Sequence, residues 1–338
     1  MTMTWNLNGS EKRAGRKPLI SFSPELEMNF QQVLRDHTAG DPMQADVRWT
    51  NLSRRAIARA VAALGTPISH HIAGRWLRAN GFRRRQTQKK QTMGSHADRN
   101  KQFERIAALK LEYVNAGNPV VSIDTKKKEL LGNFFRAGKL ESKDPILVND
   151  HDFPSAADGK LIPHGILDLG RNLGSIHLNT SHDTSEFACE SLELWWQKEG
   201  RAAYPTATIL LVLCDGGGSN SATAFVFKQD LQALADRLGI EIRIAHFPPY
   251  CSKFNPIEHR LFPHVTRALQ GVVLESVAVA KQFMEKTSTS TGLKVTVRYL
   301  DKMYETGRKC AEDFRDSMRI VFDSVLPKWN YVAVPASA

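Results

Sequence analysis

Three acidic residues occupy positions from which a folded chain could bring carboxylates together. Asp124 and Asp215 each end an apolar, strand-like run, and Glu258 opens a helix-like segment shortly after a third such run. Mg²⁺ takes oxygen ligands, and two metal ions roughly 3.5–4 Å apart can hold the attacking and leaving oxygens of an in-line displacement. Two acids at strand ends and a third on a nearby helix therefore predict a two-metal site for phosphoryl transfer.

The elements around these acids predict an α/β fold. Strands are expected at 119–124, 208–214 and 240–246, with a hairpin around 166–169 and 175–178, and helices at 98–113, 184–199, 221–238 and 256–270. In the 184–199 helix, Asp183 is the expected cap and Ala188, Leu192 and Trp195 form an apolar stripe. This order predicts a mixed sheet flanked by helices.

The N-terminal part contains signals for short helices. Leu26, Phe30, Val33 and Leu34 fall on one helical face. Two further helices are predicted, one capped by Ser53 and ended by Gly65, the other capped by Ser69 and followed by Gly81. Their expected inward residues are Ile57, Val61, Leu64, Ile72 and Trp76. A tight turn between two short helices is typical of a helix-turn-helix.

Basic residues concentrate on and after the second of these helices. Between Arg75 and Lys101 there are nine Lys or Arg residues and one acid, Asp98. We expect Arg75 and Arg78 on the helix, and the run 83–85 after it, to contact DNA phosphates. The residues of that run are Arg83, Arg84 and Arg85. The alternative is a plain helical hairpin whose arginines are only solvated.

Composition supports a polyanionic partner. The 338-residue chain has a formal net charge of +11 and a pI near 9.5, and its 42% hydrophobic content is ordinary for a globular protein. No run approaches the roughly 20 apolar residues of a membrane span. The first residues lack the apolar core of a signal peptide, so we expect a cytoplasmic protein. The four cysteines lie far apart, which argues against a zinc ribbon or disulfides.

Several motifs occur in consistent order along the chain. They are Gly40-Asp41-Pro42 with Trp49-Thr50, the run 121–129 around Asp124, His182-Asp183-Thr184, the run 215–220 from Asp215, His246-Phe247-Pro248-Pro249, the run 252–262 around Glu258, the run 291–295 and Trp329-Asn330-Tyr331. On these residues the chain resembles the Rhodopirellula-type DDE transposases of bacterial insertion sequences (the ISAzo family), within the wider group of mariner-like enzymes. The resemblance extends over nearly the whole sequence.

The resemblance implies an RNase H-like catalytic core in which Asp124, Asp215 and Glu258 bind Mg²⁺ or Mn²⁺, with two ions expected. Asp124 would bridge both ions, Asp215 would hold one, and Glu258 would complete the shell of the second. The chain departs from the family in two ways. Family members usually carry a further helix-turn-helix ahead of the Arg16-Lys17 region, and at Phe254 they more often have Trp.

Other residues near the acids have two readings. Lys126, Lys127 and Lys128 are candidate DNA-phosphate contacts, or a solvated charge run. The glycines of Gly216-Gly217-Gly218 would let backbone approach a phosphate, or would only form a tight turn. Histidine is a poor ligand for Mg²⁺, so we expect His246, His259 and His264 to support the acids or contact DNA.

These observations divide the chain into a basic leader and helix (1–45), a helix-turn-helix region (46–95), an RNase H-like catalytic domain (96–275) and a C-terminal helical extension (276–338). The C-terminal stripe of Cys310, Phe314, Met318, Val321 and Phe322 has helical spacing. It is expected either to pack on the catalytic domain or to form contacts between copies.

The leading hypothesis is a transposase that cuts element-end DNA and joins it to target DNA. Its partners would be the double-stranded DNA of element ends and target, with no membrane. Because two ends must be joined together, a homodimer or larger assembly on DNA is expected. Two alternatives stay open: an RNase H-like nuclease without strand transfer, and a truncated, inactive copy that acts only by binding DNA.

Overall fold

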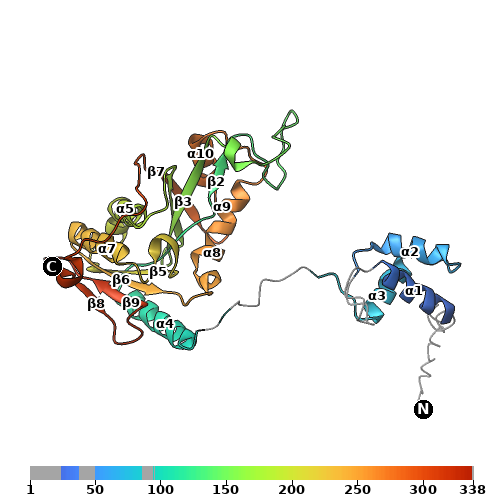
Figure 1. Ribbon diagram of the computed structural model, residues 1–338, viewed down its shortest axis with the longest axis horizontal. Coiled ribbons are helices and arrows are strands. Elements are labelled where there is room, and N and C mark those ends of the chain that lie inside the picture. The colour runs from blue at the N-terminus through green and yellow to red at the C-terminus, as the bar shows by residue number, and fades with distance from the viewer. Residues whose placement is uncertain (1–23, 38–49, 86–93, 95, 337–338) are drawn as a thin grey trace, which may run out of the picture. The chain divides into compact units, whose positions relative to one another are not determined.

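The computed structural model describes residues 24–37, 50–85, 94 and 96–336 (Figure 1). The chain separates into two compact units, Met1–Lys89 and Lys90–Ala338. The sequence motif Gly40-Asp41-Pro42 and Trp49, together with Lys89 and Lys90 of the basic stretch, lie outside the described residues.

The first unit is a bundle of short helices: α1 (Pro24–Asp36), α2 (Arg54–Ala63) and α3 (His70–Ala79). Both predicted N-caps are confirmed, because Ser53 accepts a hydrogen bond from the amide of Ala56, and Ser69 accepts one from the amide of Ile72. The α1 stripe is buried as predicted, and Phe30 meets Trp76 of α3 edge to face, with 5.1 Å between ring centroids. The leader helix thus shares one hydrophobic core with the helix pair.

One inward residue was predicted wrongly. Leu64 is 39% exposed, because α2 ends at Ala63 and Leu64 forms its C-cap rather than a further turn. Gly65 follows with φ +92°, a left-handed conformation that turns the chain away from the core.

The second unit is built on one mixed sheet of nine strands. The strands are β1 (Val120–Thr125), β2 (Glu129–Leu131), β3 (Gly159–Asp168), β4 (Leu173–Asn179), β5 (Ile209–Cys214), β6 (Glu241–His246), β7 (Lys294–Tyr299), β8 (Ile320–Phe322) and β9 (Asn330–Ala333). Their order is β7-β4-β3-β1-β5-β6-β9-β8, with β2 paired to β3. β1, β5 and β6 run parallel, whereas β3 is antiparallel to both β1 and β4. The predicted mixed sheet is confirmed.

Helices cover both faces of this sheet (Figure 1). They are α4 (Arg99–Asn115), α5 (Ser185–Trp195), α6 (Arg201–Ala203), α7 (Phe225–Leu238), α8 (Ile257–Arg260), α9 (Phe262–Ala268), α10 (Val277–Glu285) and α11 (Phe314–Ser317). Successive strand residues point to opposite faces. Val121 and Ile123 accordingly pack with α5 and α7, whereas Val120 packs with α4. The helices α8, α9 and α10 cover β3, β4 and β7.

Two helices differ from the prediction. The expected 256–270 helix breaks at Leu261, because Pro263 at the start of α9 has no amide N–H for an unbroken helix. The 184–199 helix continues past Trp195 as one π-helical turn over Trp196–Gly200. We predicted Asp183 as its cap, but the cap is Thr184, whose hydroxyl accepts a hydrogen bond from the amide of Phe187.

The C-terminal segment 276–338 is not the helical extension that we expected. Its strands β7, β8 and β9 extend the sheet at both edges, and its longest helix is the nine-residue α10. The stripe from Cys310 packs on the core of the second unit through Cys310, Phe314 and Met318. The chain becomes extended at Met318, so Val321 and Phe322 lie in β8 and are exposed.

Candidate active site

The sheet brings two of the predicted acids together at the carboxyl ends of neighbouring strands. β1 and β5 are adjacent and parallel, and Ser122 lies opposite Leu213 in their register. Asp124 and Asp215 each follow two residues later, so they leave the sheet side by side. Asp215 comes directly after β5 and Asp124 is the second-last residue of β1.

Glu258 reaches the same place from α8. The negative charges of the three acids act on one another. The pKa of Asp124 is raised to about 8 by burial first, then by the charge of Asp215 and by the charge and hydrogen bonding of Glu258. Burial also raises the pKa of Asp215, with a further contribution from Glu258, although a hydrogen bond from the amide of Gly217 opposes the shift. The arrangement therefore concentrates half-buried negative charge at the carboxyl end of the sheet.

A buried side-chain link fixes α8 against β1. Ser122 donates its hydroxyl proton to Oδ1 of Asn255 and accepts from the amide of Ile257 at 3.0 Å. Asn255 in turn donates from Nδ2 to the carbonyl oxygen of Ile123 at 3.0 Å. Both side chains are fully buried. The link joins the strand of Asp124 to the start of the helix of Glu258, and Ser122 was not identified from the sequence.

A glycine in β3, Gly165, lets α8 pack close to the sheet. Gly165 lies opposite Asp124 in the register of β1 and β3. A Cβ at this position would lie 2.6 Å from the ring of Phe262 and 2.8 Å from Ile257. Because only glycine leaves room for these two side chains, Gly165 sets the distance at which α8 and α9 cross the sheet.

His246 contacts the backbone of Asp215 through a buried hydrogen bond. The ring is fully buried, and burial lowers its pKa to about 4, so it is neutral near pH 7. Nδ1 lies 2.8 Å from the carbonyl oxygen of Asp215, and Nε2 lies 2.9 Å from the hydroxyl of Tyr331. Nδ1 therefore donates and Nε2 accepts, which holds the backbone of Asp215. This fits the supporting role that we expected, whereas His259 is exposed on α8.

The family comparison now agrees with the geometry. The model of the Rhodopirellula transposase DDE domain matches residues 29–335, which is most of the chain. The chain belongs to this transposase family. The mixed sheet flanked by helices confirms the predicted α/β class of the second unit. No curated protein sequence is significantly similar to the chain.

Solved structures with some likeness are complexes of the Mos1 mariner transposase. The paired-end complex with Mg is 14% identical, with a TM-score of 0.45, and the alignment covers 83% of this chain and 75% of that chain. The paired-end complex with Mn is 16% identical, with a TM-score of 0.44, covering 82% and 74%. The strand transfer complex is 14% identical, with a TM-score of 0.42, covering 78% and 71%.

The candidate phosphate-binding lysines of this transposase separate into two kinds. Lys126, which we expected at the DNA, is buried, and its ammonium forms an ion pair with Glu129 in the segment between β1 and β2. Lys127 and Lys128 are exposed beside Asp124. The glycines from Gly216 to Gly218 are exposed after Asp215, and a side chain at Gly217 or Gly218 would meet no atom within 4 Å.

The candidate DNA-binding arginines lie in the other unit. Arg75 and Arg78 are exposed on α3, and the run from Arg83 to Arg85 is exposed after it. Arg83 donates to the backbone oxygens of Arg78 and Phe82, which folds its guanidinium back over the end of α3. These basic side chains are therefore exposed along α3 and directly after it.

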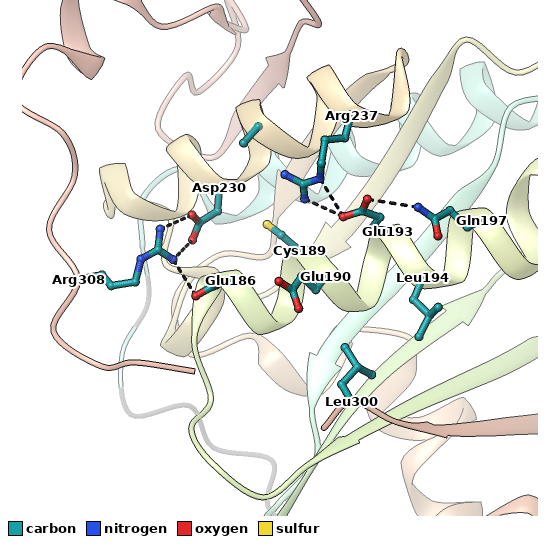
Figure 2. Close-up of a pocket in the computed structure, with 11 residues that line it drawn as sticks. Glu186, Cys189, Glu190, Glu193, Leu194, Gln197, Asp230, Arg237, Leu300 and Arg308 are labelled. Atoms are coloured by element: carbon teal, nitrogen blue, oxygen red, sulfur yellow. Dashed lines mark hydrogen bonds and ion pairs between the residues drawn. The ribbon is translucent and has the colours of Figure 1, made fainter. Parts of the chain in front are cut away.

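The structure also has a cavity of about 670 Å³ between α5, α7 and the segment that follows β7. Its acids are already paired with cations (Figure 2). Arg308 binds Asp230 and Glu186, and Arg237 binds Glu193. None of the three triad acids lines it, so this cavity is separate from the place where they meet.

The three triad acids could together hold a divalent cation. In the described part of the chain, no three His, Cys, Asp or Glu side chains are arranged as a metal-binding group. The donor chemistry nevertheless fits: the acids offer carboxylate oxygens, the ligands that Mg²⁺ and Mn²⁺ prefer. Their mutual repulsion, seen in the raised pKa of Asp124, is the kind that a bound cation relieves.

Within the described residues no helix is both long and apolar enough to cross a membrane.

Proposed function

We propose that this protein is a transposase that binds element-end DNA and carries out metal-dependent strand cleavage and strand transfer at Asp124, Asp215 and Glu258. The observation that carries the proposal is the meeting of these acids at one edge, where Asp215 and Glu258 both raise the pKa of Asp124. Membership of the transposase family supports the choice of DNA as substrate. Among the similar Mos1 structures, one is a paired-end complex with the left transposon end, and two are paired-end complexes with Mn or Mg.

The division of work among residues follows from their positions. Two bound Mg²⁺ or Mn²⁺ ions would activate the attacking oxygen and stabilise charge on the phosphate. Asp124, Asp215 and Glu258 would hold them. The Ser122–Asn255 link orients α8, and His246 holds the backbone of Asp215.

Cationic side chains would hold the DNA. Lys127 and Lys128 are exposed next to Asp124 and can neutralise phosphates near the cut. In the first unit, the exposed end of α3 and the run 83–85 would bind the element end, with phosphate contacts setting position and base contacts setting sequence preference. We also propose that two copies act together, because two element ends must be joined to one target.

A strand-transfer assay tests the proposal. The full-length protein is incubated with Mn²⁺, a labelled duplex that carries the inverted-repeat end of the element, and a supercoiled target plasmid. We expect nicked duplex and also covalent joining of the freed 3′ end to the plasmid. Nicking without joining would support a hydrolytic nuclease, and DNA binding with neither product would support an inactive copy.

A further inference from the structure

Asp183 lies at the same edge of the sheet as the three triad acids. β1 is antiparallel to β3, and β3 is antiparallel to β4, so β4 runs in the direction of β1. The carboxyl end of β4 is Asn179, and Asp183 follows it four residues later, just ahead of α5. The topology thus places a fourth carboxylate beside the strand ends of Asp124 and Asp215.

The carboxylate of Asp183 is directed to the active site and not to its own helix. Thr184 caps α5, which leaves Asp183 free of that role. Instead its Oδ1 accepts a hydrogen bond from the hydroxyl of Thr125, the residue after Asp124, at 3.0 Å. The negative charge of Asp183 also acts on Asp215 and contributes to raising its pKa.

A buried histidine beside this acid has no partner. His164 of β3 lies opposite Thr125 in the register, so the two side chains share one face of the sheet. The ring is fully buried, and neither nitrogen has a hydrogen-bond partner among the described residues. The charge of Asp183 reaches it. An unpaired polar ring next to an acid is costly in a folded core unless a further group completes the site.

We propose that Asp183 is a fourth acid of the active site, which binds the divalent cation together with Asp124, Asp215 and Glu258. The inference rests on the proposed function, because the cation is that of the transposase reaction. The physical reason is charge and reach. Asp183 adds a carboxylate to the cluster from the opposite face of the sheet, at a position that α5 and Thr125 hold in place.

Mn²⁺ binding by the full-length protein, without DNA, tests this inference. Free Mn²⁺ is measured by electron paramagnetic resonance during titration of wild type, Asp183→Asn, Thr125→Val and Asp215→Asn. Glu186→Gln is the matched control. It removes one negative charge three residues further along, from a side chain that is paired with Arg308 (Figure 2) and with Lys302.

We expect Asp183→Asn to weaken Mn²⁺ binding roughly tenfold. Glu186→Gln should stay within about twofold of wild type, because its charge is compensated by cations. Thr125→Val should weaken Mn²⁺ binding less than Asp183→Asn does, since the valine removes the hydrogen bond but keeps the carboxylate. Asp183→Glu retains the charge and should bind Mn²⁺ more tightly than Asp183→Asn. Thermal unfolding of each variant checks that it is folded.

The outcomes separate the two proposals. Wild-type affinity in Asp183→Asn, with weakened binding in Asp215→Asn, overturns the fourth acid and leaves the triad intact. Equal losses in Thr125→Val and Asp183→Asn also overturn it, because Asp183 would then act only through Thr125. Unchanged Mn²⁺ binding in Asp215→Asn would instead remove the basis of the proposed function.

Discussion

The link between Ser122 and Asn255 gives a prediction about how Glu258 is held in place. Asn255→Ala removes two buried hydrogen bonds, one from the hydroxyl of Ser122 and one to the carbonyl of Ile123. A buried hydrogen bond contributes about 1–1.5 kcal/mol. We therefore expect the free energy of unfolding of the catalytic unit to fall by about 2–3 kcal/mol. For a domain of this size that lowers Tm by about 4–12 °C.

The same substitution should reduce catalysis more than DNA binding. Glu258 lies three residues after Asn255, so a loosened α8 lets its carboxylate move away from Asp124. Losses of about 10–100-fold are usual when a residue that orients a metal ligand is removed. We expect DNA cleavage to fall in that range, while Kd for end DNA stays within about twofold, because the arginines that we propose to bind DNA are unchanged.

A double-mutant cycle with Ser122→Ala makes the test specific. Ser122 and Asn255 share one hydrogen bond, so their effects on the free energy of unfolding should be less than additive by about 1 kcal/mol. The assay is urea unfolding of wild type, both single variants and the double variant. Strictly additive effects, or an Asn255→Ala protein as stable as wild type, would refute the role given to this link.

Three further predictions concern DNA binding, assembly and stability. Alanine at all three positions of 83–85 should reduce the slope of log K against log salt by about 3 units in DNA titrations, and an unchanged slope would mean that the run is only solvated. Light scattering should find two or more protein copies when paired end DNA is added, whereas concerted joining by a one-protein, one-duplex complex would contradict this. Asp323→Asn should lower the free energy of unfolding by about 2–3 kcal/mol at pH 7, because Asp323 binds Arg105 and Arg243. Burial opposes ionisation of Asp323, but hydrogen bonds from Arg105 and the neighbouring groups lower its pKa overall. This stabilisation is therefore present above about pH 4 and is lost as the pH falls through the lowered pKa. Equal destabilisation by Asp323→Asn at pH 7 and pH 2.5 would contradict the prediction.

The sequence predicted the centre of the sheet well for a physical reason. β1 and β5 are buried strands whose residues form largely apolar runs, and β6 alternates Ile242 and Ile244 with charged residues, so all three stand out from the surrounding helices. Serine caps and left-handed glycines likewise defined α2 and α3. These signals are local, and local signals can be read from one sequence.

The edges of the sheet were missed because their signals are weak or ambiguous. β8 and β9 have only three and four residues. β9 is defined by its pairing with β6 over a long sequence distance, and β8 is defined by its pairing with β9. The stripe from Phe314 to Phe322 satisfied a helical period, although the chain turns at Met318. The alternation of Val295 and Val297 with polar residues in β7 was a usable strand signal.

The candidate site was predictable in its acids but not in their support. The family resemblance pointed to Asp124, Asp215 and Glu258. By contrast, Asp183 has the sequence context of a helix cap. Only the hydrogen bond from the amide of Phe187 to the hydroxyl of Thr184 shows that another residue caps α5. Lys126 belongs to a run of three lysines, yet its burial against Glu129 depends on the turn between β1 and β2.

The most direct test of the central claim is cleavage of end DNA by Asp124→Asn, Asp215→Asn and Glu258→Gln in Mn²⁺, with DNA affinity measured on the same samples. Each change keeps the size of the side chain and removes one carboxylate. We predict that cleavage falls by at least about 10³-fold in every variant. The Kd for end DNA should stay within about twofold of wild type, because the arginines of α3 and 83–85 are unchanged. Cleavage close to the wild-type rate in any one of the three would contradict the shared active site.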